Sequence, residues 1–227
     1  MALLVSGLRG LEELILNALF PRTCVVCGKE GGWACAECSL VLEDIQIYRT
    51  VAARGEEILS FFNFDQPLVR ELLHNLKYGN IWEIAPVLVD LINSQYSNLK
   101  LKSYCANAVL IPVPSSLVTL KSRGYSQAEE LAKALGRGLD LPVWSSALTK
   151  TSQKGSQVGR NAQERAESAA RAFAWKKGEI PEKLKRRPWI LVDDLLTTGS
   201  TVNACLDVLR TRTTIPLKAL TLAYTPK

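Results

Sequence analysis

Two adjacent carboxylates, followed within a few residues by hydroxyls and a glycine, are the groups in this sequence best placed to do chemistry together. Residues Trp189–Thr201 read WILVDDLLTTGST, so an apolar and aromatic run leads directly into Asp193 and Asp194. Such a run predicts a buried strand that ends at the two acids. In α/β folds the carboxyl end of a central parallel strand faces the crevice that binds ligands. The segment therefore predicts a ligand site.

The residues after the acids suit a phosphate group. A helix predicted over residues 200–210 directs its free backbone N–H groups and the positive end of its dipole toward the crevice. Gly199 lets the backbone approach a ligand closely, and hydroxyl donors lie on both sides of it. We therefore expect a dianionic phosphate to bind to Thr197, Thr198, Gly199, Ser200 and Thr201.

Asp193 and Asp194 would serve the other end of such a ligand. Two carboxylates can accept hydrogen bonds from vicinal hydroxyls, or hold a Mg2+ ion that bridges a diphosphate. A phosphate together with a vicinal diol describes a ribose 5-phosphate. The simpler alternative is a helix N-cap with an aspartate-rich turn, which would explain a lone pair of aspartates but not the whole string.

Four of the six cysteines follow the spacing C-x2-C-x7-C-x2-C. Two close pairs that converge supply the thiolates of a tetrahedral site, and a closed thiolate site suits zinc. A rubredoxin-like iron site, a redox dithiol and two disulfides are the alternatives. Because so short a segment cannot bury an adequate core, we expect structural Zn2+ to hold it together. The predicted metal ligands are Cys24, Cys27, Cys35 and Cys38.

The composition is that of a folded chain with a modest basic excess. Its 227 residues carry 28 Lys and Arg against 22 Asp and Glu, a net charge of +6 that is compatible with phosphates or nucleic acid as ligands. No segment approaches the roughly 18 apolar residues of a membrane span. Residues 1–20 have the spacing of an amphipathic helix, and Glu12 and Glu13 argue against a signal peptide. We therefore expect a cytoplasmic protein without a transmembrane segment.

The apolar segments alternate between strand and helix patterns. Strands are predicted at residues 57–64, 108–113, 143–148, 189–192 and 217–224, and helices at residues 67–77, 81–96, 126–139 and 200–210. Such alternation predicts an α/β fold with a mostly parallel sheet and flanking helices on both faces.

Two units are expected along the chain. Residues 1–45 would form an N-terminal helix and a four-cysteine zinc ribbon, and residues 46–227 the α/β domain. Inside the domain, residues 149–187 are polar and long enough to suggest either a functional segment or a solvated loop. A helix is predicted in its middle, at residues 162–173.

The string around the two acids resembles the motif that binds phosphoribosyl pyrophosphate (PRPP) in type I phosphoribosyltransferases. Other blocks narrow the resemblance to the ComF family of competence proteins (ComFC/GntX-like). They are IPVPSSLVTLKSRGYSQAEELAKAL at residues 111–135, LKYG at residues 76–79, and the paired cysteines. The resemblance covers nearly the whole chain in order. It implies a type I phosphoribosyltransferase-like domain preceded by a zinc ribbon.

The resemblance also implies roles for individual residues. The two acids would hold the ribose hydroxyls, and residues 197–201 the 5-phosphate. The loop after the first sheet strand and the polar segment at residues 149–187, which would close over the site as a hood, would bind pyrophosphate. The candidates there are Ser115, Ser116, Arg123, Gly124, Lys150, Lys154 and Arg160. Lys77, expected on the other side of the fold, is a weaker anion-binding candidate. His74, the only histidine, is expected in a structural or surface role.

Two departures from the family pattern bear on activity. Thr197 stands where purine-salvage enzymes carry the aspartate that acts as a base, which disfavours a hypoxanthine or guanine acceptor. Ser126 and Ser168 stand where the family has asparagine, which weakens the case for full catalysis. The expected chemistry is substitution at the anomeric carbon with pyrophosphate leaving. Whether the chain is a phosphoribosyltransferase, a glycosyltransferase that turns over PRPP, stays open, as does its acceptor.

The resemblance implies binding of PRPP or a nucleotide 5-phosphate with Mg2+, and a link to natural competence and DNA uptake. The alternative is a non-catalytic single-stranded DNA-binding protein of the transformation machinery, with other competence proteins as partners. Basic residues that favour it are Lys176, Lys177, Lys183, Lys185, Arg186 and Arg187. A third interpretation is a scaffold that keeps the fold as a docking surface.

Overall fold

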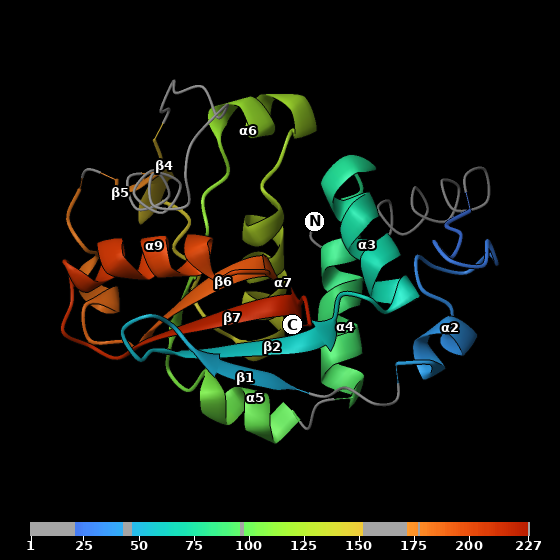
Figure 1. Ribbon diagram of the computed structural model, residues 1–227, viewed down its shortest axis with the longest axis horizontal. Helices are drawn as coiled ribbons and strands as arrows, with labels where there is room; N and C mark the ends of the chain where they lie inside the picture. Colours follow the sequence, from blue (N-terminus) through green and yellow to red (C-terminus); the bar gives the residue numbers. More distant parts are fainter. Residues whose placement is uncertain (1–20, 43–46, 96–97, 152–171, 177, 227) are drawn as a thin grey trace, which may run out of the picture.

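A five-stranded sheet forms the centre of the molecule (Figure 1). The computed structural model describes residues 21–42, 47–95, 98–151, 172–176 and 178–226. The strand order is β1-β2-β7-β6-β3, in which β1 is antiparallel to β2 and the other neighbours are parallel. The strands are β1 (Tyr48–Val51), β2 (Glu57–Asn63), β3 (Val109–Pro112), β6 (Trp189–Leu196) and β7 (Leu217–Tyr224). The predicted mostly parallel sheet is confirmed.

The central strands are apolar because neighbours or helices cover them on every side. All four residues of β3, with the sequence VLIP, are buried, and so are the first four of β6, WILV. Val109 of β3 lies opposite Trp189 of β6, which in turn lies opposite Leu217 of β7. Because β6 lies between two parallel neighbours, its carboxyl end lies at the same edge of the sheet as those of β3 and β7.

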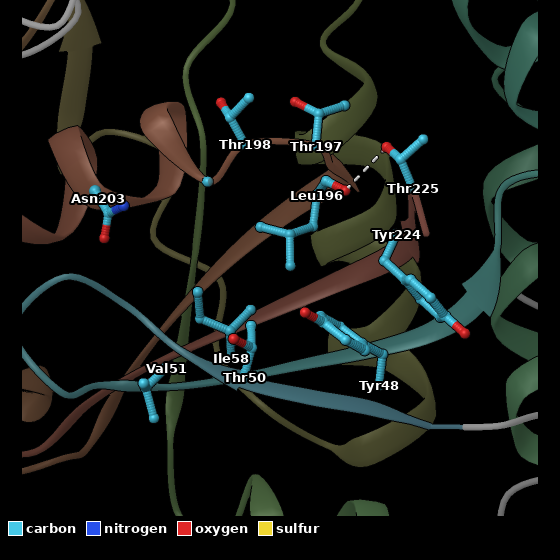
Figure 2. Close-up of a pocket in the computed structure, with 11 residues that line it drawn as sticks. Tyr48, Thr50, Val51, Ile58, Leu196, Thr197, Thr198, Asn203, Tyr224 and Thr225 are labelled. Carbon is cyan, nitrogen blue, oxygen red and sulfur yellow. Dashed lines mark hydrogen bonds between the residues drawn. The ribbon is translucent and has the colours of Figure 1, made fainter. Parts of the chain in front are cut away.

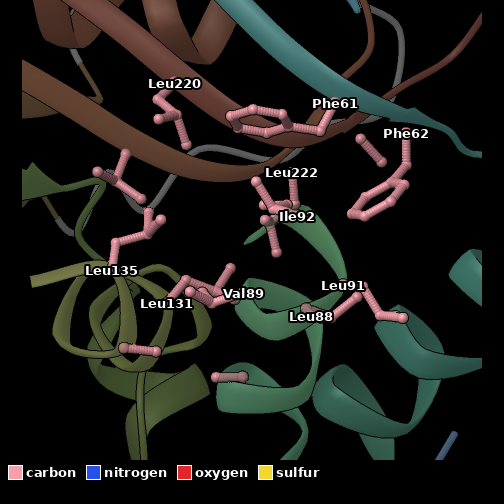
Figure 3. Packing of buried hydrophobic residues seen from close by; sticks show 14 of the residues in the cluster. Phe61, Phe62, Leu88, Val89, Leu91, Ile92, Leu131, Leu135, Leu220 and Leu222 are labelled. Atoms are coloured by element: carbon pink, nitrogen blue, oxygen red, sulfur yellow. The ribbon is translucent and has the colours of Figure 1, made fainter. Parts of the chain in front are cut away.

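Of the helices in the described ranges, α3 (Pro67–Tyr78), α4 (Ile84–Gln95) and α7 (Gln127–Leu139) contribute most of the core on one face of the sheet. Figure 3 shows side chains of α4 and α7, among them Ile92 and Leu131, on the side of Phe61 of β2 and Leu222 of β7, both fully buried. The amphipathic spacing that predicted α3 and α7 is explained by this packing, since their apolar stripes form the core.

Helix α9 (Ser200–Arg210) covers the opposite face. Successive strand residues point to opposite sides of a sheet. Accordingly, Ile190 and Val192 of β6 belong to the core under α4 and α7, whereas Trp189 and Leu191 belong to the core that includes α9. Helices therefore cover both faces, as the sequence predicts.

Shorter elements complete the description. The helices are α2 (Ala36–Leu40), α5 (Asn98–Tyr104), α6 (Leu117–Arg123) and the 3-10 helix η1 (Glu182–Leu184). Strand β4 (Leu148–Lys150) pairs antiparallel with β5 (Phe173–Trp175) in a separate two-stranded ribbon. Among the described residues, no helix combines the length and apolar character that crossing a membrane requires.

Three predicted bounds are wrong in part. Residues 143–148 are not a strand, because a turn at Ser145–Ser146 separates a single bridge at Val143 from β4. Strand β6 does not end at the acids but continues to Leu196, since its pairing with β7 extends that far. Phe173, predicted as the end of a helix, lies in β5. Residues 1–20 and 162–171, where two helices are predicted, lie outside the described residues.

Candidate functional site

The loop between β6 and α9 contains the residues that the sequence predicts to bind a phosphate. Gly199 is the N-cap of α9 and adopts φ 77°, a left-handed conformation that glycine tolerates without strain. The Ser200 backbone N–H donates to Thr198 Oγ1 at 3.4 Å, and Thr198 Oγ1 donates to Ser200 Oγ at 3.1 Å. Thr197, Thr198 and Ser200 are exposed. The helix N-terminus and its hydroxyls are therefore accessible to an anion.

The two acids lie in β6 just before this loop. Asp193 Oδ1 accepts a hydrogen bond from the Asp194 backbone N–H at 3.0 Å. Asp194 Oδ2 lies 2.8 Å from Lys77 Nζ, and the two side chains are only 13% and 24% exposed. Burial of the carboxyl, followed by the charge of Asp194, raises the pKa of Asp193 to about 8. The acid couple therefore carries less negative charge near neutral pH than two free aspartates would.

Lys77 is placed differently from its sequence-based prediction, which put it on the other side of the fold. The C-terminal turn of α3 brings its ammonium into contact with Asp194. In Figure 1, α3 and α4 stand near the arrowheads of the central strands, the edge at which β6 ends. The sequence could not reveal this contact, because it joins two segments that are far apart in the chain.

The segment after β3 forms the facing wall. Ser116 is the N-cap of α6, its hydroxyl accepting from the Thr119 backbone N–H at 3.0 Å. Ser115 Oγ donates to Ser126 Oγ at 3.0 Å. Gly124 ends α6 with φ 78°. The wall therefore has an ordered backbone with hydroxyls on its surface.

A cavity of about 310 Å³ brings most of the predicted residues together. Its lining contains both acids, hydroxyls from two loops, and cations from α3, α6 and β4. The predicted site residues in it are Ser115, Ser116, Arg123, Lys150, Asp193, Asp194, Thr197 and Thr201. Gly124, Thr198, Gly199 and Ser200 flank it without lining it. Lys154 and Arg160 lie outside the described residues.

The cavity also has lining residues that were not assigned to the site. The polar ones are Thr119 and Gln127, and Lys77, predicted only as a weaker anion-binding candidate, lines it as well. Gln127 is the last residue of RGYSQ, residues 123–127, within the block that carries the family resemblance. That position could have identified Gln127 as a site candidate. His74 is exposed on α3, with its ring 5.0 Å from that of Tyr78, as expected of a surface residue.

A smaller cleft of about 90 Å³ adjoins the phosphate loop (Figure 2). Tyr48 of β1 and Tyr224 of β7 form one side of it, stacked with ring centroids 4.6 Å apart. Thr225 Oγ1 donates to the Leu196 carbonyl at 3.3 Å. Thr197 lines both the cleft and the larger cavity, so the loop separates the two.

The four clustered cysteines converge as predicted. Their Sγ atoms all lie within 4.8 Å of one another. Burial acts to raise the pKa of Cys24, but backbone hydrogen bonds from Cys27 and Cys35 lower it to about 6. The Cys35 thiol, followed by burial, raises the pKa of Cys38 to about 12. So many crowded thiols fit a site that a thiophilic cation would complete.

Comparison with known proteins gives matches along the same region. A sequence profile of the phosphoribosyl transferase domain matches residues 113–227. The chain is 37% identical over 103 residues to Competence protein F of Haemophilus influenzae, covering 44% of this chain and 43% of that protein. It is 28% identical over 143 residues to DNA utilization protein YhgH of Escherichia coli (strain K12), covering 60% and 58%. The chain thus spans about half the length of the curated relatives it matches.

Similar solved structures include orotate phosphoribosyltransferase from Aeropyrum pernix. That match has 17% identity and a TM-score of 0.35 and covers 83% of this chain and 80% of that one. Adenine phosphoribosyltransferase from Saccharomyces cerevisiae has 12% identity and a TM-score of 0.34, covering 83% and 90%. The matches to Competence protein F and YhgH confirm the predicted resemblance to competence proteins. The phosphoribosyl transferase profile together with the observed sheet confirms the predicted fold class.

Proposed function

The chain belongs to the phosphoribosyl transferase domain family, and from this premise we propose that it binds PRPP or a nucleotide 5-phosphate in the 310 Å³ cavity. One observation carries the proposal. The acid couple, the loop before α9 and the Ser115–Arg123 wall, which come from separate segments, line or border one cavity. Together they offer acceptors for sugar hydroxyls and two groups of donors for anions.

Each part of the ligand has a matching part of the site. The 5-phosphate would bind at residues 197–201, where backbone N–H groups and the helix dipole favour negative charge. Asp193 and Asp194 would accept hydrogen bonds from the ribose hydroxyls. The diphosphate would lie along the opposite wall, near Ser115, Ser116 and Arg123, whose guanidinium can form paired hydrogen bonds to phosphate oxygens.

The acids do not fit a directly bound Mg2+ ion. Mg2+ requires near-octahedral oxygen ligands at about 2.0–2.1 Å, whereas Asp194 is already paired with the Lys77 ammonium. Asp193 is partly neutralised by its raised pKa. We therefore propose that Mg2+ enters with the diphosphate, whose charge it would neutralise, and is not held by these carboxylates.

Any reaction would be substitution at the anomeric carbon. The bond to the departing pyrophosphate would break as the acceptor bonds to the same carbon, and the leaving group would depart toward the cations of the wall. Arg123 and Lys150 would stabilise its growing charge. Thr197 supplies no carboxylate base beside the acceptor position, so the acceptor would need to be a nucleophile that requires no such base.

A titration tests the proposal. Isothermal titration of PRPP with Mg2+ present should show binding by the wild type. The double variant Asp193→Asn/Asp194→Asn should bind at least about tenfold more weakly, because each amide replaces one of the two carboxyl oxygens that can accept from a ribose hydroxyl. Asp90→Asn, on the exposed surface of α4, is the matched control and should bind like the wild type. Absence of binding by the wild type would exclude the proposed ligand.

For the N-terminal segment we propose a structural zinc ribbon within residues 1–45. The convergence of Cys24, Cys27, Cys35 and Cys38 supports it. Zinc would be held in a closed four-thiolate shell, with no open position for chemistry. Metal analysis of purified protein should then find zinc in preference to iron.

A second candidate function is binding of single-stranded DNA. A groove of about 460 Å³ at the far end of α9 is lined by Lys185, Arg210 and Arg212 with neighbouring threonines. Arg212 lies 5.5 Å over the Trp175 ring, an arrangement that suits phosphate and base together. However, Lys185 pairs with Glu182 and Arg210 with Glu56, so part of the positive charge is already neutralised.

A mobility-shift experiment separates the two candidates. Arg212→Ala should weaken DNA binding at low salt, and wild-type affinity should fall steeply as salt rises. An affinity independent of salt would argue against a phosphate-tracking groove. The names of the relatives, Competence protein F and DNA utilization protein YhgH, support a cellular role in DNA uptake or use under either candidate.

A further inference from the structure

Lys77 ends inside the cavity, although it belongs to a helix outside the matched family region. Its Nζ lies 2.8 Å from Asp194 Oδ2, and its side chain is 24% exposed. Water screens an ion pair less when it is partly buried than when it lies on the surface. The Lys77–Asp194 pair is therefore part of the electrostatics of the site.

The neighbours of Lys77 in sequence are both anchored to the segment that bears the diphosphate wall. The Tyr125 hydroxyl donates to the Leu76 carbonyl at 2.6 Å. The Arg123 guanidinium lies 4.9 Å from the centroid of the Tyr78 ring. Because Leu76 and Tyr78 flank Lys77, the hydrogen bond to the Leu76 carbonyl holds the backbone beside Lys77, and the ring contact joins the same helical turn to Arg123. The LKYG and RGYSQ blocks are thus interlocked in space.

Gly79 ends the helix at this point. A Cβ atom there would lie 2.8 Å from the Asn75 carbonyl oxygen and 2.9 Å from Asn75 Oδ1, closer than real Cβ contacts. Glycine therefore permits the tight turn that follows Tyr78. Together with the two anchors, this turn holds Lys77 in the last turn of α3, at the edge of the cavity.

A lysine ammonium in this position changes what the acids can bind. It neutralises Asp194, and it would repel a divalent cation approaching the same carboxylate. It also shares the cavity with Ser115, Ser116 and Arg123, so it can donate to phosphate oxygens there. The Lys77 ammonium would thus contact both the acid couple and the diphosphate of the proposed ligand.

On the premise of the proposed function, we propose that Lys77 is the cation of this site that pairs with the acid couple. It keeps divalent metal off the acid couple and contacts the diphosphate end of the ligand directly. Binding of the diphosphate would then depend less on Mg2+ than in a site whose positive charge comes from metal alone. Lys77 acts as a specificity-determining residue, independently of whether the chain turns its ligand over.

Metal alone gives the first test. Mn2+ is titrated into zinc-loaded protein and the free ion is followed by electron paramagnetic resonance. We expect Lys77→Met to gain a site at least about tenfold tighter than any in the wild type, because Asp194 is released. Adding Asp194→Asn to that variant should remove the gained site. Equal Mn2+ binding by the wild type and Lys77→Met would overturn the proposal.

PRPP gives the second test, by titration in metal-depleted buffer with and without added Mg2+. Without Mg2+, Lys77→Met should bind at least about tenfold more weakly than the wild type, and added Mg2+ should restore most of the loss. Lys133→Met is the matched control, since Lys133 pairs with Glu129 and Glu130 on α7 and does not line the cavity. Equal affinities of the wild type and Lys77→Met without Mg2+ would overturn the proposal.

Two further outcomes are distinguishable. If the wild type binds no PRPP in either buffer, the proposed function fails, and the Mn2+ titration still decides whether Lys77 excludes metal. If Lys77→Met does not fold, Lys77→Gln keeps a polar end without the charge and replaces it in both tests. Lys77→Arg keeps the charge and should exclude Mn2+ as the wild type does.

Discussion

At the scale of single residues, the two aspartates differ although they are adjacent in the chain. Successive strand residues point to opposite faces of a sheet. Asp194 meets Lys77 of α3, on the face that α3 and α4 cover. Asp193 lies toward α9, where its charge adds to burial in raising the pKa of Cys205. Among the residues that the structure describes, only Asp194 of the two acids therefore has an ammonium in direct contact.

This difference predicts a pH-dependent stability. The pKa of Asp193 is raised from its ordinary 3.8 to about 8, so between these values the folded state holds a proton that the unfolded state has released. The free energy of unfolding should therefore decrease as pH rises from about 4 to about 8. Asp193→Asn mimics the protonated carboxyl, so its free energy of unfolding should change less over that range.

Denaturant unfolding at pH 5 and pH 8 checks this prediction. We expect the wild type to lose at least about 1 kcal/mol more than Asp193→Asn between the two pH values. Asp90→Asn, whose side chain is exposed, should follow the wild type. Parallel pH profiles for the wild type and Asp193→Asn would show that the carboxyl ionises without cost in the folded protein.

Individual residues also show which parts of the site could be predicted from the sequence alone. The acids, the hydroxyls and the four cysteines could be singled out because each set is contiguous or regularly spaced. Their partners could not be, since Lys77 reaches Asp194 only through the packing of α3 against the sheet edge. The cleft beside Tyr48 and Tyr224 could not be predicted for the same reason, because these two residues are far apart in the chain.

At the scale of elements, the loop from β6 to α9 depends on one backbone conformation. Gly199 has φ 77°, and a Cβ there would meet Asn203 Nδ2 at 3.5 Å and Leu196 Cδ1 at 3.7 Å, which are ordinary contacts. The cost of a side chain at this position is therefore conformational and not steric crowding. The glycine lets the chain turn from strand to helix while its N–H groups stay accessible.

Replacing this glycine tests the loop. Gly199→Ala should destabilise the protein by about 1–2 kcal/mol, because alanine resists the left-handed conformation. It should also weaken binding of inorganic phosphate or PRPP. Gly138→Ala is the control: it lies exposed within α7, where a Cβ meets nothing closer than 3.7 Å. That change should stabilise by about 0.5–1 kcal/mol. Equal effects of the two substitutions would contradict this account.

Long elements could be predicted from the sequence more accurately than short ones. Helix α9 and strand β7 have the predicted bounds, because their apolar periodicity is set by the cores they enter. Helix α6 was not predicted, since it buries no residue and so has no apolar stripe. Strand β1 lies at the edge of the sheet and has no fully buried residue. Its four residues therefore show too little apolar alternation to predict a strand.

At the scale of the whole molecule, the cysteine segment is joined to the α/β domain. Val25 and Trp33 pack against the core that α3 and α4 share. Arg22 Nη2 lies 3.0 Å from Glu83 Oε1, just before α4. Leu42, which follows α2, is fully buried in the same core. Loss of order in this segment would therefore expose apolar surface of the main domain.

Removal of the proposed zinc should consequently destabilise the α/β domain as well as the cysteine segment. Helix α2 of this segment has no buried side chain, so without a cation little apolar packing would hold the four cysteines together. A chelator should lower the melting temperature of the whole protein, and near-ultraviolet circular dichroism should change in the same transition. Cys27→Ser, at an exposed ligand position, should reproduce the effect without chelator. The Cys105→Ala variant keeps all four clustered cysteines. Chelator should therefore still lower its melting temperature. If zinc is lost while the melting temperature stays constant, the segment folds without metal and the thiolate cluster has another purpose.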